Sequence, residues 1–336
     1  MRSHKWLVGI TGGSGFIGSS LVNYLARLFD IRILDISPPK QKFGGNVSFQ
    51  VCDIGDFEEL KRSLQDVDLV IHTAIVQIPL INEDKRLAYR VNFLGTQNVC
   101  EVVDKSQNIK GMILAGSWHT IGERELRGVI NEEFGFRPDK VEERARLYAL
   151  AKIAQEAIVR FYDEMSDKTF GIIRMGTVLG DNMPEKTAAN IFIDNGLKGK
   201  PLTPFKNSMF RPMLYVNIED SCQAYEIFAR RILTSEPKKI ANSLDHVFNL
   251  FYPEPITILE LAETVRETIM KCSDGRIEPK IEVVDTGYPS LFGEEEKKLI
   301  KVDISKALRY LGFQGLRSPK ESIEQIVKMR INRVPL

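Results

Sequence analysis

The sequence predicts a doubly wound α/β fold, in which helices cover both faces of a parallel β-sheet. In the first half of the chain, short segments rich in Val, Ile and Leu alternate with longer segments of helical spacing. Strands that are apolar on both faces are typical of a buried parallel sheet. After about residue 180 this rhythm changes, and Pro and Gly become frequent. We therefore expect residues 1–180 to form this fold and residues 181–336 a smaller mixed α/β region, with part of 211–250 packing back on the first.

The expected elements follow from these two kinds of segment. Short apolar segments predict strands at residues 6–11, 31–35, 47–52, 69–74, 112–115 and 170–174. Helical spacing between them predicts helices at residues 15–29, 57–64, 85–105 and 141–165. In the second part, the clearest predicted helices are residues 256–271 and 318–328.

Composition restricts the class of protein. A chain of 336 residues, 43% hydrophobic and 27% charged, is typical of a globular protein with one large or two linked domains. The 46 basic and 45 acidic residues give a net charge of +1. No overall field therefore attracts nucleic acid or an anionic membrane. Neither a signal-peptide core nor an uncharged apolar run of about 18 residues is present in the sequence.

Cysteine and histidine usage indicates neither disulfides nor a metal site. The four cysteines lie far apart without a CxxC pair, and the four histidines lack the spacing of metal ligands. Free thiols are typical of a reducing compartment, so we expect a cytoplasmic protein. These cysteines are Cys52, Cys100, Cys222 and Cys272.

A glycine-rich turn joins the first predicted strand to the first helix. The segment TGGSGFIG occupies residues 11–18, with Gly12, Gly15 and Gly18 at fixed spacing. Such glycines let the backbone turn tightly, approach a pyrophosphate and pack the helix against the strand. The helix amino terminus adds free N–H groups and a partial positive charge. The turn predicts a dinucleotide site, and hence a Rossmann fold for residues 1–180; a purely structural turn is the alternative.

An acidic residue follows at the end of the second predicted strand. Asp35 lies near the offset of about 20 residues expected for a carboxylate that binds the adenosine ribose hydroxyls. Because a carboxylate repels a 2′-phosphate, the sequence favours NAD over NADP. The alternative for Asp35 is a simple cap at the strand end.

Tyr148 and Lys152 are four residues apart in a predicted helix and therefore share one face. An ammonium group near a phenol favours the phenolate, so we expect Lys152, helped by the positive nicotinamide ring of an oxidised cofactor, to lower the pKa of Tyr148. The phenol could then act as a general base that takes a hydroxyl proton while hydride leaves the same carbon. A pair on a surface helix without function is the alternative interpretation.

Ser117 follows the predicted strand at 112–115, at the carboxyl edge of the sheet. Its hydroxyl can donate to a substrate oxygen during hydride transfer, or it can cap a loop. The next residues are less informative. His119 could be a catalytic partner of Ser117, but at a spacing of two residues we expect it to pack or to face solvent. Trp118 is expected either to border the substrate or to pack in the core.

Further motifs accompany these residues: Cys52-Asp53-Ile54, His72-Thr73-Ala74, Val91-Asn92, Gly95-Thr96, and Gly122 five residues after Ser117. Together the motifs resemble an extended short-chain dehydrogenase/reductase over essentially the whole chain. They are most similar to the NAD-dependent epimerase/dehydratase family, whose members act on nucleotide sugars. The resemblance implies NAD as cofactor, a helical dimer interface and hence a homodimer.

The resemblance also implies roles for individual residues. Asp53 and Ile54 would flank the adenine, Ala74 would line the cofactor, and Lys152 would hydrogen-bond the nicotinamide ribose. The implied cofactor-binding set is Gly12, Gly15, Phe16, Ile17, Gly18, Asp35, Asp53, Ile54, Ala74, Asn92, Tyr148 and Lys152. In the second part, Arg211 would hold a substrate phosphate and Asn190 would lie near the same group.

Three departures from the family pattern bear on the substrate. Ser117-Trp118-His119 stands where sugar dehydratases carry Thr-Asp-Glu, so we do not expect dehydration. Thr177 stands where asparagine is usual. Residues 286–298 contain no arginine, although many members place a second phosphate-binding arginine there. Together with the roles given above, the expected substrate residues are Ser117, Thr177, Asn190 and Arg211.

Three functions are compatible with this sequence. The first is an NAD-dependent epimerase on a nucleotide-linked sugar, which removes and returns hydride with Tyr148 as general base. The second is an NAD-dependent dehydrogenase or reductase on a sugar, a uronate or another secondary alcohol. The third, a dinucleotide-sensing module, would need no proton acceptor and is therefore disfavoured by Ser117, Tyr148 and Lys152.

Overall fold

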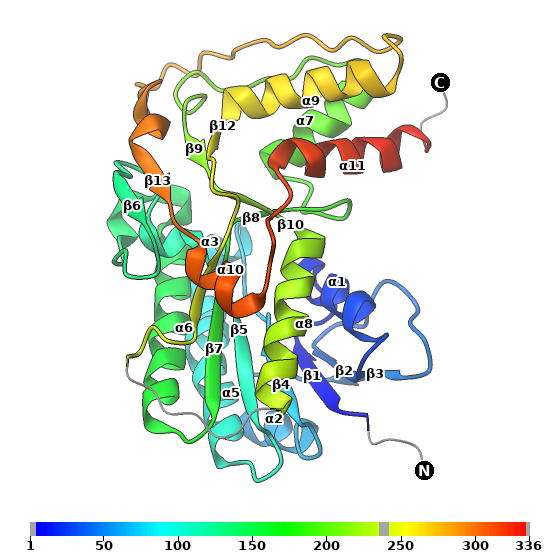
Figure 1. The fold of residues 1–336 in the computed structure, drawn as a ribbon, viewed down its shortest axis with the longest axis vertical. Coiled ribbons are helices and arrows are strands. Elements are labelled where there is room, and N and C mark those ends of the chain that lie inside the picture. The colour runs from blue at the N-terminus through cyan, green and yellow to red at the C-terminus, as the bar shows by residue number, and fades with distance from the viewer. Residues whose placement is uncertain (1–4, 235–241, 334–336) are drawn as a thin grey trace.

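In the computed structural model, which describes residues 5–234 and 242–333, a seven-stranded parallel sheet crosses the molecule (Figure 1). Its strand order is β3-β2-β1-β4-β5-β7-β11, and every neighbouring pair is parallel. The strands are β1 (Leu7–Thr11), β2 (Asp30–Asp35), β3 (Val47–Val51), β4 (Leu69–His72), β5 (Gly111–Ser117), β7 (Thr169–Met175) and β11 (Val247–Leu250). The predicted doubly wound fold is confirmed, and so are its six predicted strands.

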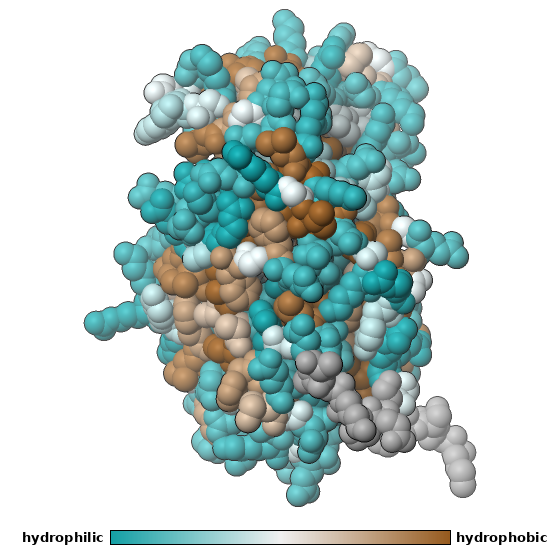
Figure 2. Space-filling model, turned by 60° about the vertical axis from the view of Figure 1, so that its left-hand side comes forward, coloured by the Kyte–Doolittle hydropathy of each residue, from teal (hydrophilic) through white to brown (hydrophobic). Residues whose placement is uncertain are grey.

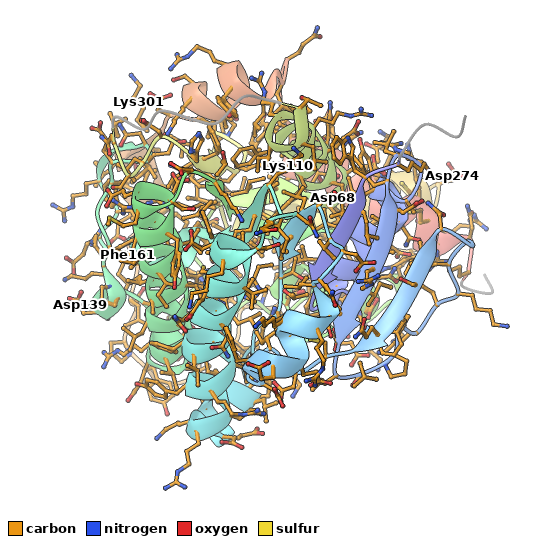
Figure 3. The ribbon with its side chains drawn as sticks, turned by 90° about the horizontal axis from the view of Figure 1, so that it is seen from below. Asp68, Lys110, Asp139, Phe161, Asp274 and Lys301 are labelled. Atoms are coloured by element: carbon orange, nitrogen blue, oxygen red, sulfur yellow. The ribbon has the colours of Figure 1, made fainter. Side chains whose placement is uncertain are left out.

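Strand order reverses between β1 and β4, which are hydrogen-bonded neighbours. In doubly wound folds, ligands bind at such a point, beyond the carboxyl ends of the strands. Asp68 and Lys110 directly precede β4 and β5, and Figure 3 views the molecule from this amino-terminal edge. The opposite edge therefore carries the candidate site.

Helices cover both faces of the sheet because its central strands, such as β1, β4 and β5, are buried on both sides. On one face, α1 (Phe16–Leu25) and α8 (Ile218–Thr234) share an apolar core with β1, β2 and β4. On the other face lie α2 (Phe57–Ser63), α5 (Thr96–Lys105) and α6 (Arg146–Met165). In β5, all seven residues are buried between these layers.

The predicted helix at 85–105 forms in three pieces. It begins as α4 (Lys85–Ala88), widens into a π-helical turn (Tyr89–Gly95) and continues as α5. Gly95 lies so close to Ile54 that a Cβ atom there would be 2.7 Å from the Ile54 side chain. The π-helical turn therefore brings this backbone against the loop after β3, which prediction from helical spacing alone does not reveal.

The predicted helix at 141–165 begins later than expected. Two 3₁₀ turns, Pro138–Lys140 and Glu143–Ala145, precede α6, which begins at Arg146. A short helix, α3 (Leu80–Glu83), and a 3₁₀ turn, Trp118–Ile121, lie near the same edge of the sheet.

Three helices form a second apolar core above the carboxyl edge of the sheet (Figure 1). They are α7 (Ala188–Leu197), α9 (Ile258–Cys272) and α11 (Pro319–Ile331). Capping boxes start α9 at Thr257 and α11 at Ser318, each paired with a glutamate three residues later. The predicted helices at 256–271 and 318–328 are thereby confirmed.

Short strand pairs and one short helix connect the two cores. The pairs are β8 (Thr177–Leu179) with β10 (Tyr215–Asn217), β9 (Pro212–Met213) with β12 (Ile256–Thr257), and β6 (Gly128–Ile130) with β13 (Ile300–Val302). A 3₁₀ turn, Glu296–Leu299, and α10 (Ser305–Leu311) flank β13 in the sequence. Because α8 packs on the sheet and β11 pairs with β7, the chain returns to the first part between residues 215 and 250.

Candidate active site

The glycine turn after β1 forms a cradle too narrow for side chains. Gly12 has φ +69°, and a Cβ atom there would be 2.6 Å from the Ala74 backbone. A Cβ atom on Gly18 would be 2.3 Å from the carbonyl oxygen of Gly12. Since α1 begins at Phe16, its free N–H groups face this turn. The geometry is that of an anion site at a helix amino terminus.

Asp35, at the carboxyl end of β2, is tied to the same turn. One carboxylate oxygen accepts a hydrogen bond from the Ser14 backbone (3.1 Å), and the other accepts one from the Ser37 backbone (3.1 Å). Each oxygen keeps a lone pair for a further donor. The carboxylate is therefore held beside the cradle, where a ribose diol can reach it.

The residues implied for the adenine side differ in their surroundings. Asp53 accepts from the Gly55 backbone (2.8 Å) and pairs with Arg90 (2.7 Å), while Ile54 is buried. Ala74 lies against the Gly12 backbone. Asn92 is fully buried, and its amide bonds both the N–H (2.7 Å) and the C=O (3.1 Å) of Val76. The structure thus shows Asn92 holding the loop after β4.

Ser117, Tyr148 and Lys152 meet at the carboxyl edge of the sheet. Ser117 ends β5, and Tyr148 and Lys152 lie on the adjacent helix α6. Ser117 lies close enough to the Tyr148 phenol to act on its pKa. The Lys152 ammonium donates to the carbonyl of Ala115, two residues before Ser117, over 2.7 Å. Residues that are 31 and 37 apart in sequence are therefore brought together by α6 and β5.

Burial governs the proton affinities of this group. It raises the pKa of Tyr148, and the neighbouring Ser117 hydroxyl acts in the lowering direction. Burial also lowers the pKa of Lys152 to about 7. Lys152 is not among the groups that shift Tyr148. In the cofactor-free chain, burial therefore outweighs any lowering of the Tyr148 pKa by Lys152, and the expected effect of Lys152 together with an oxidised nicotinamide ring stays a prediction.

His119 packs against its neighbours, as expected, but it also contacts the serine. Its Nδ1 lies 3.1 Å from Ser117 Oγ, and its Nε2 lies 3.3 Å from an oxygen of Glu123. The His119 ring also meets the Tyr148 ring edge-on, with centroids 5.4 Å apart. Trp118 is buried and donates to Thr177 (3.1 Å), so it packs in the core. The two-residue spacing from Ser117 was the available signal for His119.

Glu123 was not predicted as a site residue, although it is buried beside His119. Burial alone would raise its pKa, but the hydrogen bond and charge of His119, together with Arg211, lower it to about 2. Arg211 itself pairs with Glu142 (2.5 Å) and lies 3.9 Å from Glu123. The Arg211 guanidinium is therefore already engaged by two carboxylates.

Two predicted substrate residues keep unsatisfied polar atoms. Within the described residues, Asn190 Oδ1 and Arg211 Nε are buried without a hydrogen-bond partner. Unpaired buried polar atoms are costly unless a ligand or water satisfies them. Thr177 is another predicted substrate residue. Its hydroxyl accepts a hydrogen bond from the Trp118 indole N–H, and it lies at the start of β8.

The cradle fits a dinucleotide by its own geometry. Cβ atoms would fill the space at Gly12 and Gly18, the α1 amino terminus faces it, and the Asp35 carboxylate lies at its rim. These are the features that a pyrophosphate and an unphosphorylated ribose require. Among the described residues, no group of three or more His, Cys, Asp or Glu could hold a metal ion.

Comparison with curated proteins gives two informative relatives. The chain is 29% identical over 220 residues to a "Putative UDP-glucose 4-epimerase" of Methanocaldococcus jannaschii, covering 62% of this chain and 70% of the relative. It is 30% identical over 194 residues to the bovine "Sterol-4-alpha-carboxylate 3-dehydrogenase, decarboxylating". That match covers 57% of this chain and about half (51%) of the relative.

Solved structures share the fold over nearly the whole chain. The UDP-glucose 4-epimerase of Thermus thermophilus, solved with NAD, has a TM-score of 0.74 at 23% identity and covers 96% of this chain and 99% of its own. The UDP-glucuronic acid 4-epimerase of Bacillus cereus, solved with UDP-glucuronic acid and NAD, has the same TM-score at 22% identity, with coverages of 96% and 99%.

Residues 8–242 match the NAD dependent epimerase/dehydratase family, and this range spans β1 to the end of α8 with the glycine cradle, Ser117, Tyr148 and Lys152. The match extends over more than half of the chain. The motifs, the parallel sheet and the solved neighbours all agree with it. The chain is therefore an NAD-dependent enzyme of the extended short-chain dehydrogenase/reductase type and belongs to the NAD dependent epimerase/dehydratase family.

Proposed function

We propose that this enzyme is an epimerase of a nucleotide-linked sugar, with Tyr148 as the general base. The observation that carries the proposal is that Tyr148 lies near Ser117 at the same carboxyl edge of the parallel sheet as the dinucleotide cradle. The Methanocaldococcus relative and the solved neighbours, with their UDP-sugar names, support the substrate class.

The cofactor would be held by Gly12, Gly15, Phe16, Ile17 and Gly18 at the pyrophosphate. Asp35 would hold the adenosine ribose, and a set on the adenine and nicotinamide sides would complete the site: Asp53, Ile54, Ala74, Asn92, Tyr148 and Lys152. NAD, when bound, supplies a hydride acceptor.

Each catalytic side chain has a separate task. Tyr148 takes the proton of the reacting hydroxyl, and Ser117 orients the oxygen that carries it. Lys152 donates a hydrogen bond to the carbonyl of Ala115, which holds α6 and its Tyr148 in place beside β5. From this position Lys152 binds the nicotinamide ribose. Because epimerisation returns the hydride to the other face of the same carbon, the site must retain its proton and cofactor between the two halves of the reaction.

The substrate side is proposed to use Ser117, Thr177, Asn190 and Arg211. Asn190 Oδ1 and Arg211 Nε are buried atoms that lack a partner within the described structure, and a sugar or phosphate could satisfy them. We also propose that residues 1–180 serve the cofactor and residues 181–336 the substrate, with 211–250 shared between them.

The test combines cofactor retention with product analysis. Purified protein should release about one NAD per chain on acid precipitation, and incubation with UDP-glucose or UDP-glucuronic acid should produce the C4 epimer by proton NMR without net NADH absorbance. Tyr148→Phe should abolish turnover and leave NAD affinity within a few-fold, because the substitution removes only the phenolic oxygen. Undiminished turnover in that variant would refute the role of Tyr148.

A dehydrogenase or reductase on a sugar, uronate or other secondary alcohol is the second candidate. Two observations favour it: Arg211 is paired with Glu142 rather than free for a phosphate, and residues 286–298 contain no arginine. This function predicts net NADH formation with free NAD. It also predicts that no nucleotide raises the melting temperature of the NAD-bound protein, whereas a nucleotide diphosphate should do so for the epimerase.

We further propose a homodimer formed through α5 and α6. Leu150, Phe161 and Met165 are exposed on α6, and Tyr89 and Leu94 are exposed just before α5. Figure 3 labels Phe161 on α6, and Figure 2, which brings this side of the molecule forward, shows apolar surface in brown and tan. Contiguous apolar surface of this kind marks interfaces.

Light scattering after size exclusion tests the dimer. Phe161→Glu should give a monomer, whereas Phe205→Glu, which changes an exposed phenylalanine outside these helices, should leave the dimer intact. A monomeric wild-type protein would refute the interface.

The proposed compartment is the cytoplasm. Cys52, Cys100 and Cys222 are buried free thiols, and Cys272 is also unpaired. No helix in the described part of the chain is long and apolar enough to cross a membrane. Fractionation of cells carrying a tagged full chain would place it.

A further inference from the structure

A buried glutamine lies on the same stripe of α6 as the tyrosine and the lysine. Gln155 follows Tyr148 by seven residues and Lys152 by three, so the three side chains share one face of the helix. Gln155 is fully buried, and its Oε1 atom has no hydrogen-bond partner within the described residues. A buried polar atom without a partner lowers stability relative to an apolar side chain of the same shape. Stability alone therefore does not explain a glutamine at this position.

The Gln155 amide is bonded to one hydroxyl group on α5. Its Nε2 atom donates to Thr96 Oγ1 over 2.9 Å. Thr96 begins α5 directly after the π-helical turn, and its hydroxyl donates to the carbonyl of Asn92 (2.8 Å). A hydroxyl has one proton, so the Thr96 oxygen only accepts from its other neighbours. The Gln155 amide therefore presents its N–H to Thr96, and this assigns the orientation of the amide.

His72 extends this contact to the glycine cradle. Its ring is fully buried, with Nε2 3.0 Å from Thr96 Oγ1 and Nδ1 2.7 Å from Thr11 Oγ1. Both nitrogens face hydroxyl groups rather than carboxylates, so the buried ring is neutral. Because the Thr96 oxygen only accepts, Nε2 carries the ring proton and Nδ1 accepts from Thr11, the last residue of β1. A continuous row of buried hydrogen bonds therefore joins the cradle to α6.

The same row also holds the loop after β4. Thr73, the first residue of this loop, donates through its hydroxyl to the carbonyls of Thr11 (2.8 Å) and Gly12 (3.1 Å). Asn92, whose carbonyl receives the Thr96 proton, holds the same loop through its side-chain amide. The Thr96 hydroxyl thus links α6 to the cradle and to the loop after β4.

Gln155 ties α6 to α5, whereas its neighbours on α6 tie the helix to the sheet. Lys152 donates to the carbonyl of Ala115 on β5 (2.7 Å), and Glu156 pairs with Arg174 on β7 (2.6 Å). Polar contacts with the sheet alone leave the helix free to rock about that line. The bond from Gln155 reaches a second element, and anchors on separate elements fix the rotation of a helix.

The rotation of α6 sets the position of the Tyr148 oxygen. A turn of about 10° moves an atom about 6 Å from a helix axis by about 1 Å. A misplacement of that size at a reacting group costs about 10²-fold in rate. The bond between Gln155 and Thr96 therefore acts on the reaction through the placement of this oxygen.

We propose that Gln155, through Thr96, is a positioning residue that sets the rotation of α6 and thereby places the Tyr148 oxygen relative to the cofactor cradle. This proposal rests on the proposed function, in which Tyr148 is the general base. The glutamine raises the reaction rate, and its unpaired carbonyl oxygen is the accompanying cost in stability.

Gln155→Met separates positioning from a structural role. The variant keeps an unbranched side chain of similar size but lacks the amide. Its midpoint of urea unfolding should be unchanged or higher, because the unpaired buried oxygen is gone. The Kd for NAD should stay within about twofold, since the cradle is unchanged. The kcat for epimerisation of UDP-glucose should fall about tenfold, with KM within about twofold. A merely structural glutamine predicts the reverse, a lower midpoint with unchanged kcat.

Gln97→Met is the matched control. Gln97 on α5 donates to the Tyr162 hydroxyl on α6 over 3.2 Å, so it also joins these two helices. Tyr162 lies fourteen residues after Tyr148, towards the far end of α6, and this variant should keep wild-type kcat.

Variants of Thr96 test the same bond from its other side. Thr96→Val removes the hydroxyl that receives the Gln155 amide, so kcat should fall at least as far as in Gln155→Met. Thr96→Ser keeps the hydroxyl and should restore kcat to within about twofold of wild type. The double variant of Gln155→Met and Thr96→Val should be no slower than Thr96→Val alone, because both changes break one bond.

The two proposals fail differently. Wild-type kcat in Gln155→Met would overturn the positioning role, and so would equal losses of kcat in Gln155→Met and Gln97→Met; the general base stands in either case. If Tyr148→Phe remains active, the proposed function is refuted and the role of Gln155 fails with it. If the enzyme forms net NADH instead of an epimer, the same ratios of kcat, read from NADH absorbance, decide the role of Gln155.

Discussion

We predict that the buried Lys152 ammonium lowers the free energy of unfolding of the cofactor-free protein. Its ammonium is buried against the carbonyl of Ala115, and burial lowers its pKa from 10.5 to about 7. That difference corresponds to about 5 kcal/mol of unfavourable free energy for the charged form. Lys152→Met keeps a chain of similar length without the charge, but leaves the Ala115 carbonyl without its donor, at a cost of about 1–3 kcal/mol.

The sign of the pH dependence follows from linkage. The pKa in the folded state is below that of the unfolded chain, so the unfolded state binds more protons between about pH 7 and 10.5. The stability of the wild type therefore rises with pH across this window. Lys152→Met lacks this titration. The variant should be about 2–3 kcal/mol more stable than the wild type at pH 6, and this advantage should shrink by about 2–3 kcal/mol at pH 9.

Urea unfolding of the cofactor-free proteins at pH 6 and pH 9 measures this difference, and comparing variant with wild type cancels the other titrating groups. The variant should be inactive at both pH values. Lys168→Met provides the control: Lys168 is only partly buried, burial lowers its pKa less far, and its variant should show a weaker dependence on pH. A Lys152→Met protein that is less stable than wild type at both pH values, with no change between them, would refute the reasoning.

Three further predictions concern the cradle and the substrate side. Gly18→Ala would place a Cβ atom 2.3 Å from a backbone carbonyl and should weaken NAD binding by at least about 10²-fold by calorimetry, whereas Gly45→Ala, with nothing within 4 Å, should not. Asp35→Ser removes the carboxylate beside the ribose position and should narrow the preference for NAD over NADP about tenfold or more, measured as a ratio of Kd values. Glu142→Gln weakens the pair with Arg211 and should strengthen binding of a nucleotide diphosphate several-fold; no change would show that Arg211 does not contact the phosphate.

Local features of the sequence were enough to predict the fold and much of the candidate site. Gly12 and Gly18 are required because a Cβ atom at either position would collide with backbone atoms around the same turn. Tyr148 and Lys152 share a face of α6 because they are one helical turn apart. The alternation of strands and helices likewise specifies a parallel sheet without any long-range information. The seventh strand, β11, was not predicted, because it joins the sheet only by a return of the chain from residue 215 onwards.

The other contacts of the candidate site join residues that only the tertiary fold brings together. His119, Glu123 and Arg211 meet because Gly122 turns the chain and because Arg211, directly before β9, reaches this loop, so their spacing in sequence gives little indication of the contact. Asn92 holds the loop after β4 through Val76, a partner that motif matching does not reveal.

The amino-acid sequence by itself determined the α/β class, the dinucleotide cradle and the pairing of a phenol with a lysine, since each depends on neighbouring residues or a fixed helical period. Only the tertiary structure decided how those groups hold their protons. The pKa of Lys152 falls and that of Tyr148 rises because the packed interior withdraws water from both, and desolvation is a property of the assembled fold.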